Sequence, residues 1–206
     1  MPFVRFCCTD LPDQPWKNGL GTTKELVTWP RGAGMDDFVW RVSIAHIAND
    51  CSFSSFPGID RVITLLSGAG VVLKSHDGVL YQNLDQPLQP FAFSGDTALH
   101  ATLIKGDCFD FNLMTLASTC TGRVDVVHAQ NQSFSLKALQ GLVMACAGQW
   151  RCGDQDLHPD EGLWWHQSLP IRYRTLIPSS ADASALVVQV QPHATAPRSL
   201  AQGAAI

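Results

Sequence analysis

The sequence predicts an all-β protein whose strands form a sandwich or a barrel. Short runs of β-branched and aromatic residues recur about every 8–12 residues, and turn signals such as Asp77-Gly78 and Gly153-Asp154 separate them. No long stretch shows the 3.6-residue period of an amphipathic helix. The chain has 206 residues, a length that fits one large domain or two small fused ones.

The expected strands follow one another along most of the chain. They cover residues 38–45, 61–66, 71–74, 91–93, 98–104, 109–115, 123–128, 142–147, 162–165, 171–176 and 186–191. Only Ser67-Gly68-Ala69-Gly70 separates the second run from the third. We therefore expect these two runs to form a hairpin with a glycine-rich turn.

The order of strands and turns suggests two similar halves. The segment Gly68-Ala69-Gly70 in the first half loosely parallels Ala147-Gly148-Gln149 in the second. We expect one domain over residues 1–116 and a smaller one over 117–192. Residues 193–206 are rich in Ala, Pro, Gln and Gly, a composition that predicts a flexible tail.

Composition excludes several classes of partner. The net charge is −4, charged residues make up 16% of the chain, and no run of Lys or Arg occurs, so we expect no nucleic-acid partner. No uncharged stretch is long and apolar enough to span a membrane, and we expect no membrane partner. The start of the chain lacks the apolar run of a secretory signal. The seven cysteines form no CxxC pair, which favours free thiols and a cytoplasmic protein.

Five segments carry an unusual density of informative residues. They are WKNGLGTTKE (16–25), WRVSIA (40–45), FSSFPGIDRVITLLSGAG (53–70), PFAFSGD (90–96) and DFNLMT (110–115). In these segments the chain resembles the HutD/Ves family of cupin-type proteins. The resemblance covers nearly the whole chain, although Leu20 departs from the small residue more usual there. It implies a bicupin, in which two jelly-roll barrels form one chain.

Comparison with metal-dependent cupins indicates an anion site in place of a metal site. Those proteins show His-x-His, then a Glu that lies seven positions before the Gly of a turn. If Gly68 is that glycine, Arg61 stands where the Glu would be, and the His-x-His region falls on residues 54–57, which contain no histidine. We therefore expect no metal and no other cofactor. The planar guanidinium group of arginine can donate two parallel hydrogen bonds to a carboxylate.

Strand alternation groups the candidate ligand-binding residues by face. Arg61 shares a face with Ile63 and Leu65, Ser43 with Arg41, and Asp110 with Asn112, while Trp40 lies on the opposite face from Ser43. We expect the barrel mouth to gather Arg61, Asn112 and either Ser43 or Trp40. The full candidate set is Arg61, Asn18, Thr22, Trp40, Ser43, Asp110 and Asn112.

Each candidate also has a structural interpretation that the sequence leaves open. Arg61 could pair with Asp60 or Asp110, and Asp110 with Arg41. Asn18 and Thr22 flank the Gly19-Leu20-Gly21 segment, where such residues often cap turns. Trp40 could be a core aromatic residue.

Three classes of function remain open at this point. The first is a non-catalytic bicupin that binds a small carboxylate such as formate or formylglutamate. The resemblance implies a role in modulating histidine utilisation for HutD-type members and in stress response for Ves-type members. The second is a metal-independent isomerase or lyase acting on an organic acid, with Asp110 or a barrel histidine as the acid–base group. The third is an interaction protein with no ligand, and a homodimer formed through strand edges is compatible with all three.

Overall fold

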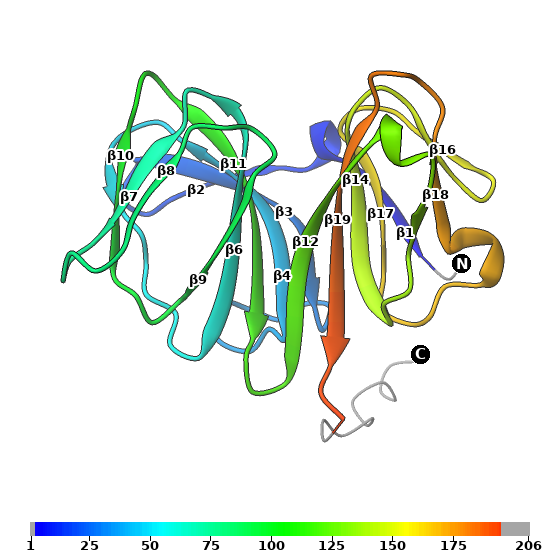
Figure 1. Ribbon diagram of the computed structural model, residues 1–206. Helices are drawn as coiled ribbons and strands as arrows, with labels where there is room; N and C mark the ends of the chain where they lie inside the picture. The colour runs from blue at the N-terminus through cyan, green and yellow to red at the C-terminus, as the bar shows by residue number, and fades with distance from the viewer. Residues whose placement is uncertain (1–2, 195–206) are drawn as a thin grey trace.

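The computed structural model describes residues 3–194, which form nineteen β-strands and three short 3-10 helices. All strand pairs are antiparallel, and they build four sheets arranged as two barrels side by side (Figure 1). These residues form no α-helix, and none of their 3-10 helices is long and apolar enough to cross a membrane. The predicted all-β bicupin fold is thereby confirmed.

The first barrel packs a six-stranded sheet against a four-stranded one. The larger sheet has the order β2 (Asp13–Pro15), β3 (Gly21–Trp29), β4 (Trp40–Ile47), β11 (Cys108–Leu116), β6 (Ile59–Gly68) and β9 (Pro90–Ser94). The smaller one has the order β5 (Cys51–Ser52), β10 (Leu99–Leu103), β7 (Val71–Ser75) and β8 (Tyr81–Leu84). Buried aliphatic side chains from both sheets, among them Ile63, Leu65 and Leu73, fill much of the space between them.

The second barrel repeats this plan with fewer strands. Its larger sheet has the order β1 (Val4–Cys7), β17 (Glu161–Trp165), β14 (Gln140–Ala147), β19 (Ser184–Pro192) and β12 (Cys120–His128). Its smaller sheet has the order β13 (Phe134–Ser135), β18 (Thr175–Pro178), β15 (Trp150–Cys152) and β16 (Gln155–Leu157). The 3-10 helices are η1 (Cys8–Asp10), η2 (Ala129–Asn131) and η3 (Ile171–Tyr173).

The first strand of the chain belongs to the second barrel. β1 pairs with β17, and Phe6 lies opposite Gly162, where a Cβ atom would come within 2.3 Å of the Phe6 ring. The absence of a side chain at Gly162 therefore makes room for this ring. The segment 1–116, expected to form the first barrel alone, thus contributes one strand to its neighbour. The expected flexible tail, 193–206, lies outside the described residues except for positions 193 and 194.

Two local predictions are wrong. β6 and β7 do not form a hairpin, because β6 pairs with β11 and β9 while β7 pairs with β10 and β8. The chain changes sheets at Gly68 and Gly70, both with positive φ and both packed too closely against other backbone for a side chain. The expected strand at 171–176 is instead the helix η3 followed by β18.

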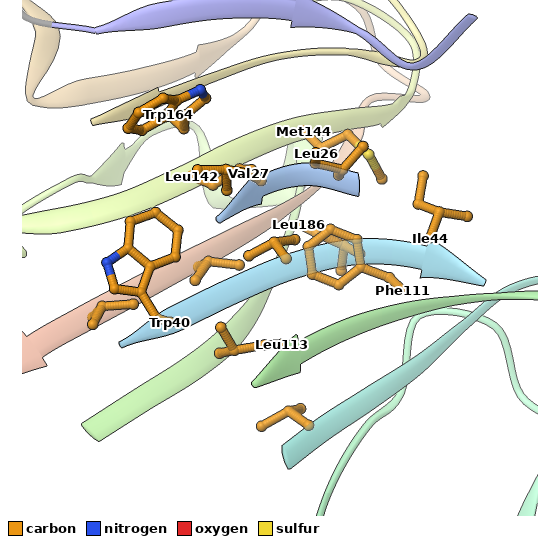
Figure 2. Close-up of a cluster of buried hydrophobic side chains, with 14 of the residues drawn as sticks. Leu26, Val27, Trp40, Ile44, Phe111, Leu113, Leu142, Met144, Trp164 and Leu186 are labelled. Carbon is orange, nitrogen blue, oxygen red and sulfur yellow. The ribbon is translucent and has the colours of Figure 1, made fainter. Parts of the chain in front are cut away.

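The largest cluster of buried side chains lies between the two barrels (Figure 2). Alternate residues of β4 and β11, such as Trp40, Val42 and Leu113, face Leu142 and Leu186 of the second barrel. The other face of β4 carries Arg41 and Ser43 and points into the first barrel. The apolar face of β4 therefore joins the barrels, and its polar face is turned inward.

Trp40 provides a test of this inter-barrel core. Its side chain is 0% exposed, and its Nε1 donates a hydrogen bond to Gln140 Oε1 at 2.7 Å. We expect Trp40→Ala to lower the free energy of unfolding by about 3–5 kcal/mol because it leaves a cavity and an unpaired amide. Urea unfolding followed by circular dichroism measures this. Ile171→Ala, at a position 84% exposed, is the control and should cost less than about 0.5 kcal/mol. A similar small cost at Trp40 would contradict the assignment.

Candidate functional site

A cavity of about 640 Å³ opens at the mouth of the first barrel. Its floor is the inward face of β4, β11 and β6, and its rim includes residues 14–18 together with Ser52 at the end of β5 and Phe53, Ser54 and Phe56 just after it. The volume lies within the usual range for small-molecule sites. It gathers four of the predicted site residues: Arg61, Ser43, Asn112 and Asn18.

Strand register arranges the floor in rows across three strands. Arg41, Met114 and Arg61 form one row. Ser43, Asn112 and Ile63 form the next row inward. Since neighbouring strands are about 4.8 Å apart, the two arginine backbones lie about 10 Å from one another with Met114 between them.

The Arg61 guanidinium is buried and has no carboxylate partner among the described residues. Its Nη1 donates a long hydrogen bond, 3.4 Å, to the Ser54 carbonyl oxygen, and its Nε is buried without an acceptor. Its Cζ lies 4.9, 5.3 and 5.5 Å from the ring centroids of Phe93, Phe53 and Phe56. Aromatic faces stabilise the cation, but they accept few of its five N–H groups.

Arg41, in contrast to Arg61, has a carboxylate partner within the protein. Its Nε donates to Glu25 Oε2 at 3.1 Å, and its Nη1 donates to Ser43 Oγ at 3.1 Å. The positive charge of Arg41 is therefore balanced within the protein. Arg61 contributes the one cation on the cavity floor that no described carboxylate balances.

Burial, and secondly the charge of Arg41, lower the pKa of Arg61 to about 10 from 12.5. Arg61 is therefore still charged at neutral pH. A lowering of this size corresponds to a cost of about 3 kcal/mol for holding the cation in the folded protein. An anion placed against Arg61 would offset this cost.

Trp40 and Thr22 do not line the cavity. Trp40 lies on the opposite face of β4, in the inter-barrel core, which confirms its alternative interpretation as a core residue. Thr22 lies on β3, where its Oγ1 donates to Asp13 Oδ1 at 3.4 Å. Its neighbour Thr23 lines the cavity instead, because adjacent residues of a strand face opposite sides. Asn18 is at the rim and also caps a turn, since its Oδ1 accepts from the Leu20 N–H.

Asp110 is fully buried one row deeper than Asn112 and does not line the cavity. Its cross-strand neighbours are Ala45 and Leu65. Its Oδ2 accepts a weak hydrogen bond from Cys108 Sγ at 3.8 Å, and its Oδ1 has no partner. Neither expected ion pair, with Arg61 or with Arg41, is present. Burial raises the pKa of Asp110 to about 7.

Several residues that line the cavity were not among the candidates predicted from the sequence. Arg41 shares a face with Ser43, so alternation alone could have placed it in the site. Phe53 and Phe56 flank the two serines of a quoted motif, but only the folded loop shows that their rings contact Arg61. Trp16 lines the cavity too, held by its Nε1 hydrogen bond to Thr23 Oγ1 at 2.7 Å.

Within residues 3–194, no three His, Cys, Asp or Glu side chains are grouped so as to hold a metal ion. The cavity lining itself contains arginine, lysine, hydroxyl and amide groups together with apolar side chains. These groups donate hydrogen bonds or carry positive charge, which suits an anionic ligand. The expectation of a metal-free site stays a prediction.

The fold defines a bicupin, and its first barrel holds a cavity with the buried guanidinium of Arg61 on its floor. The chain belongs to the HutD/Ves family, because the HutD family model matches residues 8–182. Protein Ves from Escherichia fergusonii is 38% identical over 157 residues, which cover 76% of this chain and 79% of that protein.

Two solved structures share the architecture over almost their whole length. HutD from Pseudomonas fluorescens SBW25, solved in a formate condition, is 32% identical with a TM-score of 0.79, over 93% of this chain and 99% of that one. A conserved protein of unknown function from Pseudomonas aeruginosa PAO1 is 29% identical with a TM-score of 0.81, over 93% and 100% of the two chains.

The buried carboxyl of Asp110 predicts a pH-dependent stability. Its folded pKa is raised, so the folded state holds a proton that the unfolded state releases between about pH 4 and pH 7. The contribution of Asp110 to stability therefore falls as pH rises through this window and is lowest above pH 7. We expect Asp110→Asn to raise the free energy of unfolding more at pH 8 than at pH 5, by about 1–3 kcal/mol. Urea unfolding at both pH values measures this, and an equal effect at both would contradict it.

Proposed function

We propose that the protein binds a small carboxylate, such as formate, formylglutamate or a related acid, against Arg61. The observation that carries this proposal is the buried guanidinium of Arg61, which no described carboxylate balances and whose Nε has no acceptor. Buried cations in proteins are normally paired. A ligand carboxylate would supply the missing charge and accept hydrogen bonds from the Nη groups.

We further propose that binding serves regulation in the cytoplasm rather than catalysis. The cavity lining has no carboxyl, imidazole or thiol group among the described residues, and the lining hydroxyl of Ser52 contacts an imidazole, His100 Nδ1 at 3.4 Å, only at the exposed rim. The relationship to HutD and Ves supports a role in modulating histidine utilisation or a stress response. All seven cysteines are free thiols, as a reducing compartment would keep them.

The alternative of a metal-independent isomerase or lyase would need a proton-transferring group at the ligand. No histidine of the described residues lines the cavity. The other candidate from the sequence, Asp110, has a raised pKa of about 7 that suits such a role. It lies behind the cavity wall, however, and is 0% exposed. The geometry therefore favours binding over catalysis.

Arg61→Met separates a ligand-binding role from a structural one. The change removes a buried unpaired cation and keeps an apolar side chain among the three phenylalanines, so we expect the ligand-free protein to gain about 1–3 kcal/mol of stability. The same variant should lose its response to acids. In wild type, a ligand at a hundred times its Kd should add about 2.7 kcal/mol.

A thermal-shift screen with formate, formylglutamate and related acids measures both effects. Arg123→Met is the matched control, since Arg123 is exposed and pairs with Asp125 in the second barrel. It should leave the ligand-induced shift unchanged. An undiminished shift in Arg61→Met would overturn the proposal, and so would a stoichiometric metal ion in the purified protein.

A further inference from the structure

The balance of charge on the cavity floor limits how many carboxylates a ligand can bury there. Glu25 already neutralises Arg41, which leaves the single positive charge of Arg61. The remaining charged group in the lining is Lys17, which is exposed at the rim. One ligand carboxylate balances the floor, and a second one at the same depth would be desolvated without a partner.

The surroundings of Arg61 define how a carboxylate can approach it. The rings of Phe53, Phe56 and Phe93 surround the guanidinium at 4.9–5.5 Å, so its N–H edges remain the groups that a ligand can reach. The Nε is buried and out of reach of a ligand, whereas Nη2 is not a buried unpartnered atom and donates no hydrogen bond to a described residue. A carboxylate can therefore approach the guanidinium from its Nη side and accept hydrogen bonds from it there.

The rest of the cavity suits an uncharged and largely apolar body. Its volume of about 640 Å³ far exceeds what a one-carbon acid fills. Trp16, Met35 and Met114 contribute apolar wall, while Ser43 and Asn112 contribute neutral hydrogen-bonding groups on the row next to Arg61. Such a lining favours burial of hydrocarbon with one or two oriented polar contacts.

From these three features we infer that the ligand is a monocarboxylate with an uncharged, largely apolar body of several heavy atoms. This inference rests on the proposed function and narrows it. It places such acids ahead of formate, which lacks the body, and ahead of dicarboxylates whose second carboxylate cannot reach Lys17 at the rim.

Isothermal titration calorimetry at pH 8 with a matched pair of acids tests the inference. Hydrocinnamate has one carboxylate, and benzylmalonate is the same molecule with a second carboxylate on the same carbon, too close to the first to reach the rim. At this pH both carboxylates are ionised and Arg61 is still charged. We expect hydrocinnamate to bind at least tenfold more tightly than benzylmalonate or formate, and Arg61→Met to abolish its binding.

Glu25→Gln tests the charge balance directly. The side chain of Glu25 is 37% exposed, so the isosteric change leaves the fold intact and removes the negative charge that balances Arg41. The cavity floor then carries two uncompensated cations. We expect the preference for hydrocinnamate over benzylmalonate to shrink at least threefold. Asp156→Asn, at an exposed ion pair in the second barrel, is the control and should leave the preference unchanged.

The outcomes separate failure of the inference from failure of the proposed function. If a dicarboxylate or formate binds as tightly as hydrocinnamate and its binding requires Arg61, the proposed function stands and the monocarboxylate inference is wrong. An unchanged preference in Glu25→Gln also contradicts the charge argument. If none of the acids binds, or if binding does not require Arg61, the proposed function fails and the inference fails with it.

Discussion

Strands β4, β11 and β6 of the first barrel are buried on both faces, and this constraint determines where the site lies. Their outward face, with Trp40 and Leu113, packs on the second barrel. Because that contact takes the apolar residues, the polar members of the same strands face inward, where the cavity opens. The second barrel thus fixes the orientation of Arg41, Ser43 and Asn112 without contributing any described residue to the cavity lining.

The ligand-free protein tolerates a costly arrangement at Arg61. A buried guanidinium among three aromatic rings, near a second arginine, is less stable than an apolar side chain would be there. The two inter-sheet cores of the barrels and the core between them supply the stability that keeps this cation in place. Such local instability is typical of residues selected for binding rather than for folding.

The sequence alone predicts the fold class and the central residue of the site, Arg61, but not the full set of residues that line the cavity. Arg61 was found because its spacing from Gly68 is local, and Ser43 and Asn112 followed from strand alternation.

Trp40 was misplaced because alternation gives two faces without saying which one points into the barrel, and packing of the distant second barrel decides that. Thr23 lines the cavity in place of Thr22 because β3 begins at Gly21, and the interpretation of Thr22 as a turn residue carries no information about strand faces. The pairing of β1 with β17 joins residues more than 150 positions apart, which no local pattern reveals.

The separation of Asp110 from Arg61 explains how a barrel with a buried acid and a buried base can leave both unpaired. Asp110 lies opposite Leu65, whereas Arg61 lies opposite Met114, four residues further along β11. At about 3.4 Å per residue the two backbones are about 14 Å apart along the strands, beyond the reach of an ion pair. Burial also raises the pKa of Asp110, so a substantial fraction is neutral near pH 7 and repels a ligand anion less. The positive charge of Arg61 is therefore left for a ligand to neutralise.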